Sequence, residues 1–141
     1  MKSKLWLAAI TLLLFACNRQ KAKPKEQMAF DAPALIGAST DELKEVLGDP
    51  YTQDTLTTLQ KNNGITSDLY YHIDRYNLII TVDPFTNLVK EIFVSDSAGL
   101  VETTVVLKQI SGTDHDHDRI VVKSVPAMTE KSKYTGITIS R

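Results

Sequence analysis

The run of residues 114–118, DHDHD, holds the residue types in this sequence that most clearly suggest chemistry. Imidazole nitrogens bind zinc, nickel or copper and carboxylates support such ions, so His115, His117 and Asp116 are candidate metal ligands. On a strand the histidines would lie on one face and the aspartates on the other, so only a loop could gather both. The preceding residues 111–113, SGT, favour a loop. The alternatives are a divalent-metal site and an exposed polar loop.

Cys17 is the single cysteine, which excludes an intramolecular disulfide and a CxxC site. It follows a basic start containing Lys2 and Lys4 and an almost wholly apolar run over residues 5–15. A membrane-spanning helix needs roughly 20 apolar residues, so this run is too short to span and has the length of a signal-peptide core. The sequence therefore predicts a signal peptide over residues 1–17.

Residues 14–17, LFAC, resemble the lipobox of bacterial lipoproteins, with Leu14 three positions before the cysteine and Ala16 directly before it. The resemblance implies a lipid thioether on Cys17, cleavage before it, and acylation, as by palmitate, of the new amino terminus. Two or more acyl chains give stable anchoring. Asn18 is not the aspartate that retains enteric lipoproteins in the inner membrane, so we expect an outer-membrane anchor facing the periplasm. The alternative is an ordinary secretory signal with an unrelated cysteine.

No other motif points to catalysis. His72 has no Ser–His–Asp arrangement in a recognisable local motif, and the six glycines are too scattered to cradle a phosphate. Nothing in the sequence indicates a cofactor. A formal net charge of −1 gives no electrostatic case for nucleic acid. We therefore expect a non-catalytic protein without a cofactor and without a nucleic-acid partner.

Aromatic and imidazole side chains supply a second candidate site. Exposed tyrosines commonly anchor protein interfaces, so such groups on an uncovered sheet face or its rim could bind a partner protein. The alternative is that each completes the core or covers a sheet edge. The candidate partner-binding residues are Tyr70, His72, Tyr76, Phe85 and Tyr134.

The elements that must position these residues follow a polar segment. Residues 18–29, NRQKAKPKEQMA, have no apolar periodicity and predict a flexible tether. Its basic residues could instead touch anionic lipid head groups. The rest of this 141-residue chain, residues 30–141, is long enough for one packed domain.

A short capped helix is predicted near the start of that domain. Ser39 and Glu42 have the spacing of a capping box, and apolar residues follow at helical intervals. Gly48, followed by Asp-Pro, is a stop signal. The pattern predicts a helix over Thr40–Leu47.

Strands are predicted downstream of this helix. Residues 69–73, 78–82 and 89–94 are β-rich and are separated by short segments of turn-forming residues, which predicts an antiparallel meander. A meander needs a cover on one face, and the capped helix is the candidate, so the fold class is α+β.

The C-terminal part is less regular. Residues 97–110 are compatible with a helix, although the β-branched run 103–106 favours a strand. Residues 120–125 and 135–140 predict strands, and 126–133 predict a loop or a helical turn.

Residues 35–95 resemble the fold group that contains the BamE (SmpA/OmlA) outer-membrane assembly lipoproteins and the β-lactamase inhibitor proteins. The resemblance lies in the helix entry IGASTDEL at 36–43, the helix end VLGDP at 46–50, and the paired strands that follow. It implies a short capped helix packed on an antiparallel meander. The ending at 133–139, KYTGITI, is similar to some exported proteins of this shape, and this likeness favours a helix over 97–110.

These observations favour a lipid-anchored, non-catalytic envelope protein that acts as a protein–protein interaction module, in the manner of an assembly factor or an inhibitor. The alternative is a periplasmic lipoprotein that captures divalent metal with the loop at 114–118. The membrane, through the lipid anchor, and an envelope protein are the expected partners.

Overall fold

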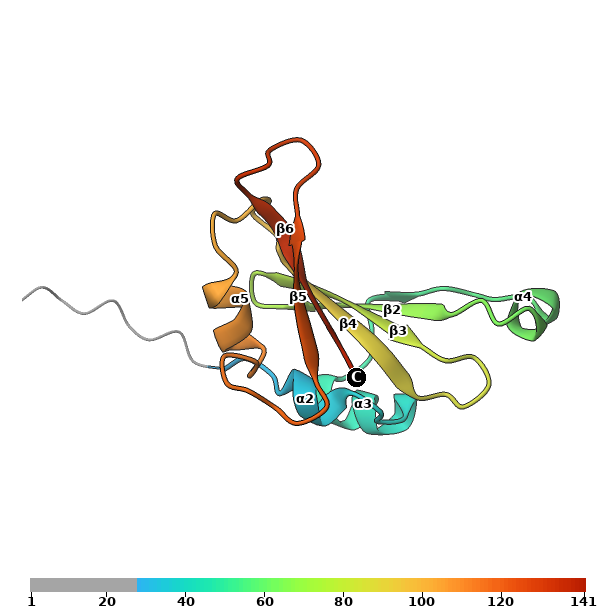
Figure 1. Ribbon diagram of the computed structural model, residues 1–141. Coiled ribbons are helices and arrows are strands. Elements are labelled where there is room, and N and C mark those ends of the chain that lie inside the picture. The colour runs from blue at the N-terminus through green and yellow to red at the C-terminus, as the bar shows by residue number, and fades with distance from the viewer. Residues whose placement is uncertain (1–27) are drawn as a thin grey trace, which may run out of the picture.

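The computed structural model describes residues 28–141, which form an α+β fold (Figure 1). The predicted signal peptide, Cys17 and nearly all of the predicted tether lie outside the described residues. Within 28–141, every helix is too short or too polar to cross a membrane.

Six strands in this part of the chain form one sheet in which every neighbouring pair is antiparallel. Their order across the sheet is β1-β2-β3-β4-β6-β5, so the last strand in sequence lies between β4 and β5. The strands are β1 (Thr52–Gln53), β2 (Ser67–Ile73), β3 (Tyr76–Val82), β4 (Val89–Asp96), β5 (Val121–Pro126) and β6 (Tyr134–Ser140).

The predicted strands are confirmed, with small changes at their ends. β2, β3 and β4 contain the three predicted segments of the meander and extend each of them by two residues. Extension is expected because ladder hydrogen bonds continue into the turns until the backbone leaves the plane of the sheet. The two C-terminal strands are also found, and residues 127–133 between them form a loop.

The described helices are α2 (Ala32–Leu35), α3 (Thr40–Leu47), α4 (Thr58–Asn62) and α5 (Val105–Ile110). Helix α3 has the bounds predicted from its capping box, which the structure contains. The Ser39 hydroxyl accepts the N–H of Glu42 at 3.3 Å, and the Glu42 carboxylate accepts the N–H of Ser39 at 2.7 Å. The helix ends at Gly48, whose φ of 80° favours a residue without a Cβ.

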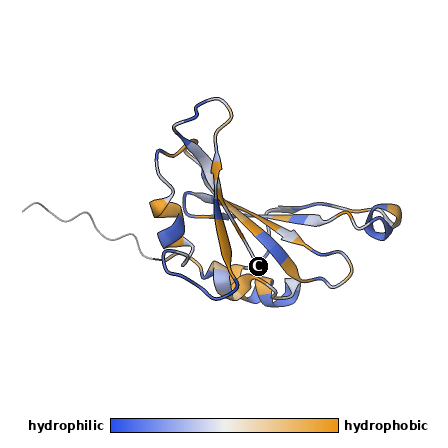
Figure 2. Cartoon of the chain, in the orientation of Figure 1, coloured by the Kyte–Doolittle hydropathy of each residue, from blue (hydrophilic) through white to orange (hydrophobic). Residues whose placement is uncertain are grey.

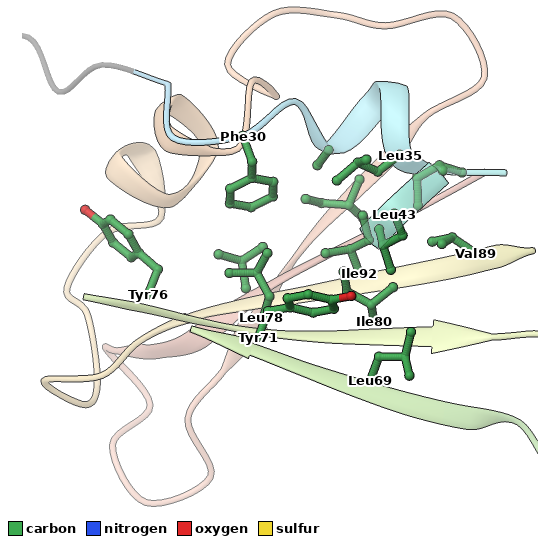
Figure 3. Packing of buried hydrophobic residues seen from close by; sticks show 14 of the residues in the cluster. Phe30, Leu35, Leu43, Leu69, Tyr71, Tyr76, Leu78, Ile80, Val89 and Ile92 are labelled. Atoms are coloured by element: carbon green, nitrogen blue, oxygen red, sulfur yellow. The ribbon is translucent and has the colours of Figure 1, made fainter. Parts of the chain in front are cut away.

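One face of the sheet, hereafter the covered face, holds the hydrophobic core. Buried residues recur at every second position of β3, as the two-residue period of a strand requires. Figure 3 shows Leu35 and Leu43 on the helical side of the core and Ile80 and Ile92 on the sheet side. Full burial of such an aliphatic side chain contributes about 1.5–3 kcal/mol. This layer therefore supplies the main stabilisation of the fold.

Residues 97–110 are helical only over α5, so the expectation of a helix across the whole segment is wrong for its first part. Asp96 bridges to Gly99 in a turn, and Val101 bridges to Tyr134. In α5 the β-branched residues stay helical because Leu107 and Ile110 are buried against the sheet. Figure 2 shows apolar and polar residues on different parts of this helix, as its amphipathic role requires.

The segment between α3 and β2 has structure that the sequence analysis did not predict. It contains the two-residue strand β1 and helix α4, which begins with a second capping box formed by Thr57 and Gln60. No side chain of α4 is buried. Figure 1 shows α4 at the end of the molecule opposite α5.

An ion pair ties the β2–β3 turn to the end of β4. Arg75, in the turn, donates from Nε to the Asp96 carboxylate at 3.0 Å, and its terminal nitrogen contacts the same oxygen. The other Asp96 oxygen accepts the N–H of Ala98 at 2.9 Å. Burial raises the pKa of this carboxyl, but the hydrogen bonds from Arg75 and Ala98 outweigh burial and hold it below its ordinary value.

Candidate functional site

The second face of the sheet, hereafter the open face, carries the residues that alternate with the core. On β3 it presents Asn77, Ile79 and Thr81, which are half-buried, whereas their neighbours on the covered face are buried. The helix side chains of the buried core cluster pack with the covered face. Figure 1 shows α2, α3 and α5 on that same side of the sheet.

A row of side chains with an aromatic and aliphatic centre crosses the middle of the open face. Because the strands are antiparallel and in register, residues from six strands lie side by side across the ladder. Tyr70, Ile79 and Phe93 form its centre and are all half-buried. The whole row, from one edge of the sheet to the other, is Thr52, Tyr70, Ile79, Phe93, Thr138 and Lys123.

Phe93 owes its place in this row to a glycine on the neighbouring strand. A Cβ built on Gly136 would lie 2.7 Å from the Phe93 ring and would also meet the carbonyl of Val94. The ring therefore lies directly over the glycine and shields it from solvent, as aromatic residues do for glycines in strands. Gly136 is buried for this reason although it lies on the open face.

Polar rows flank the central row on both sides. On one side His72 lies opposite Asn77, and its Nδ1 is 2.8 Å from the Asn77 side-chain oxygen. On the other side Asp68 lies opposite Thr81, whose hydroxyl donates to the Asp68 carboxylate at 2.8 Å. An apolar centre with a polar rim is the arrangement found in protein interfaces.

Tyr51 extends the aromatic row at the β1 edge. Its ring centroid is 6.3 Å from that of Tyr70, with the ring planes tilted by 55°. Its N–H donates to the Tyr70 carbonyl at 3.0 Å, and its side chain is 66% exposed. The charge of Asp54 is the largest influence on the Tyr70 hydroxyl and raises its pKa, with smaller contributions from burial and from the charges of Asp68 and Tyr51.

The structure brings together only two of the five predicted partner-binding residues. Tyr70 and His72 are on the open face, two positions apart on β2. Phe85 is 66% exposed but lies in the β3–β4 loop. Tyr134 is half-buried and pairs with Val101.

Tyr76 corrects the prediction. It is only 3% exposed and belongs to the core, so it cannot anchor a partner on an uncovered face. The strand register is the physical reason, because Tyr76 lies opposite Ile73 and shares the covered face with Leu78. Figure 3 shows it among the core side chains, and the Arg75 guanidinium lies 5.5 Å from its ring centroid.

Three residues were missed in the sequence analysis, namely Ile79 and Phe93 on the open face and Tyr51, whose ring lies beside Tyr70 at the β1 edge. Ile79 and Phe93 were within predicted strands, and the alternation of their neighbours could have placed them on the face opposite the core. Tyr51 lay outside any predicted element, so no local signal marked it.

The loop at 114–118 does not gather its ligand types. His117 Nε2 is 2.8 Å from the carbonyl oxygen of Gly112, and His115 lies 3.7 Å from the Asp114 carboxylate. The loop and Lys108 line a hollow of about 270 Å³. Within residues 28–141, no three His, Cys, Asp or Glu side chains are grouped as a metal site would require. In this conformation Asp116, His115 and His117 therefore do not form a three-ligand group.

A cleft of about 300 Å³ lies between α3, the α4 segment and the β3–β4 turn. Lys44, Lys61, Asp54 and Asp83 all line it. Asp83 is already satisfied, because Lys90 lies 2.7 Å from it and two backbone N–H groups donate to it. These contacts, that of Lys90 first, hold the pKa of Asp83 far below its usual range. The cleft presents both signs of charge, so its lining favours no single class of ligand.

Comparisons with known proteins add little to this description. No protein-family model matches the chain. No curated protein matches it. Among solved structures the chain is similar to a cysteine-rich secretory protein from Staphylococcus aureus subsp. aureus Mu50, with 7% identity and a TM-score of 0.49. The match covers 82% of this chain and 46% of that one, so this chain spans less than half of its length.

Proposed function

We propose that this protein is a non-catalytic interaction module of the bacterial envelope that binds another protein through the open face of its sheet. The observation that carries the proposal is the central row of that face. Tyr70, Ile79 and Phe93 are neighbours on three strands, although the covered face already holds the core. Aromatic and aliphatic side chains at the centre of a polar surface are the usual anchors of a protein interface.

The fold group is part of the same proposal. A capped helix that ends in Leu-Gly and leads through a short edge strand into an antiparallel meander supports a relationship with the BamE and β-lactamase-inhibitor fold group. Fold alone does not fix function, since one fold hosts many activities. The proposed role, that of an assembly factor or an inhibitor, therefore depends on the open face.

The anchor completes the proposal. Lipidation of Cys17 would hold the domain at the outer membrane on its periplasmic side. Labelled palmitate should be incorporated into the wild-type chain and not into a Cys17→Ser variant, because no other cysteine is present. Incorporation that survives this substitution would contradict the anchor.

Partner capture tests the open face. The full chain is affinity-purified from envelope extract in parallel with Ile79→Lys, which places a charge in the central row, and with Val46→Lys as the matched control. Val46 is 64% exposed and lies on α3, away from the open face. We expect one partner to be recovered with the wild type and with Val46→Lys, and to be lost with Ile79→Lys, since a desolvated charge opposes association.

Two further measurements make the result decisive. Thermal unfolding of each variant shows whether it is folded, and Thr138→Lys charges the same row from a different strand. Recovery of an identical set of proteins by the wild type and both open-face variants would refute the proposed function.

A further inference from the structure

Two acidic residues, Asp54 and Asp68, lie opposite each other where β1 meets β2. The N–H of Asp54 donates to the carbonyl of Asp68 at 2.9 Å, and the N–H of Asp68 donates to the Asp54 carboxylate at 3.4 Å. Like charges at directly opposed positions of a ladder destabilise a sheet. Neither carboxylate forms an ion pair with any residue in 28–141, and Lys61, which lines the same cleft as Asp54, is not within ion-pair distance of it. Among the described residues, each carboxylate therefore accepts a hydrogen bond, from the Asp68 N–H or the Thr81 hydroxyl, but neither is ion-paired with a basic side chain.

The Tyr51–Tyr70 pair lies at the same corner. Asp68 and Tyr70 are two positions apart on β2, the Tyr51 ring lies beside the Tyr70 ring, and Asp54 is hydrogen-bonded to Asp68, so the four residues lie in one region. The exposed Tyr51 ring and the half-buried Tyr70 ring, tilted against each other, present aromatic surface beside the carboxylates. The π-face of a tyrosine attracts cations, and a carboxylate beside it adds to that attraction. Both features select for positive charge.

We propose that the partner bound by the open face inserts an arginine side chain at this corner, between the Tyr51–Tyr70 pair and the carboxylates of Asp54 and Asp68. The inference rests on the proposed function, because it specifies the chemistry of the partner at one end of the central row. Charge complementarity is the argument for this occupant. The guanidinium would neutralise two carboxylates that no described residue of the chain neutralises.

Arginine fits this corner better than the other cations. A planar guanidinium stacks on an aromatic ring while its N–H groups donate to carboxylates, whereas an ammonium group is compact and more strongly hydrated. A divalent metal would need more oxygen ligands than two carboxylates, and no larger group of acidic or histidine side chains is assembled in the described part of the chain. The expected order of affinity is arginine above lysine, and both above a neutral analogue.

The experiment titrates the full chain, in a mild non-ionic detergent, with the peptide acetyl-Gly-Arg-Gly-amide. The chain is labelled with ¹³C in its five tyrosines, and their ring signals are assigned from Tyr→Phe variants. We expect the signals of Tyr51 and Tyr70 to shift, and those of the three other tyrosines to stay in place. The same peptide with citrulline, which keeps the shape of arginine without its charge, should bind at least about tenfold more weakly.

Variants assign the effect to the carboxylates. In Asp54→Asn/Asp68→Asn the affinity for the arginine peptide should fall at least about tenfold, and in the control Asp118→Asn it should be unchanged. Asp118 is an exposed aspartate in the loop before β5. Equal binding of the arginine and citrulline peptides, or an unchanged affinity in the double variant, would overturn the inference. Tighter binding of the same peptide with lysine in place of arginine, or displacement of the arginine peptide by millimolar calcium chloride, would also overturn it.

The outcomes separate this inference from the proposed function. The peptide titration needs no envelope partner. If the arginine peptide binds but partner capture does not depend on Ile79, the cation site is supported and the proposed function is refuted. Conversely, capture that is lost with Ile79→Lys and retained with Asp54→Asn/Asp68→Asn would preserve the function and overturn the arginine site.

Discussion

Ile79 and Ile80 are adjacent on β3, and they lie on opposite faces of the sheet. Ile80 is fully buried beneath the helices, whereas Ile79 is half-buried in the central row of the open face. Strand alternation alone therefore gives two residues of the same type different roles. Ile80 excludes water from the core of the domain. We propose that Ile79 excludes water only when a partner protein is bound.

The comparison extends to the polar groups of the two faces. The buried Asp96 on the covered face has Arg75 as its partner, and its position supports the fold. Asp54 and Asp68 at the corner of the open face have no basic partner among the described residues, and their opposition costs stability. Asp96 therefore has a basic partner, whereas Asp54 and Asp68 have none among the described residues. We propose that a partner protein supplies the basic group that they lack.

Truncating the two isoleucines tests the comparison most strongly. Ile80→Ala should lower the free energy of unfolding by about 2–5 kcal/mol, because it leaves a cavity in a closely packed core. Ile79→Ala, the matched change one residue away, should cost less than about 1.5 kcal/mol, since solvent and neighbouring side chains can fill the space. Urea denaturation of both variants gives the two values. Equal decreases in the free energy of unfolding would mean that the two faces are packed equally and that the comparison is wrong.

Gly136→Ala should have the next largest effect, about 1–3 kcal/mol. The new methyl group would collide with the Val94 carbonyl and with the Phe93 ring, so the ring must leave the open face. Circular dichroism during thermal unfolding measures the loss. Thr138→Ala, on the same strand as Gly136, is the control. Gly99→Ala is unsuitable because the backbone of Gly99 has a φ of 111°, which strains any residue with a Cβ. A Gly136→Ala variant as stable as the wild type would refute the close approach.

Replacing the paired carboxylate on the covered face should cost about 1–3 kcal/mol at neutral pH. In Asp96→Asn the charge-assisted bonds from Arg75 are lost, while the amide oxygen can still accept the N–H of Ala98.

The pH dependence of this effect has a defined sign. Because the pKa of Asp96 lies below its ordinary value of 3.8, its stabilisation is complete above that value and is lost as the pH falls through the lowered pKa. The unfolding free energies of wild type and Asp96→Asn should therefore converge in acid. A constant difference from pH 7 to pH 2 would contradict the ion-pair explanation.

Tyr71→Phe should produce the smallest change, and we expect it to stabilise the protein by up to about 1 kcal/mol. Tyr71 is 3% exposed, and its hydroxyl oxygen has no hydrogen-bond partner within residues 28–141. Burial, followed by the charge of Asp49, raises the pKa of this hydroxyl. Removing the oxygen should therefore raise the midpoint of thermal unfolding slightly. A clear decrease would show that the hydroxyl has a partner or a bound water.

Local signals account for the parts of the fold that were predicted. Helix α3 was predicted with its observed bounds because the Ser39–Glu42 box and Gly48 act within a few residues of the chain. The meander was predicted because alternation and turn-forming residues are also local. Helix α4 has a capping box as local as that of α3, formed by Thr57 and Gln60, and the sequence analysis did not use that signal.

The candidate site was predicted only in part, because its composition depends on pairing between distant segments. Tyr70 and His72 were identified, yet Tyr51 joins them through the β1–β2 pairing, and Phe93 through the β3–β4 pairing. Tyr76 was assigned to the wrong face because it lay before the predicted strand at 78–82, so the alternation that places it with Leu78 was not extended to it. A shift of one residue in register exchanges the faces of a whole strand.

By itself the sequence determined the capped helix, the meander strands and the α+β class, while the lipidation of Cys17 stays a prediction. Each of these depends on residue types within a few positions of one another. Only the tertiary structure decided that β6 lies between β4 and β5, that Tyr76 is buried, and that Asp54 faces Asp68 beside two tyrosines. The physical reason is that strand pairing joins residues far apart in the chain, and its register is chosen by the burial of whole faces together.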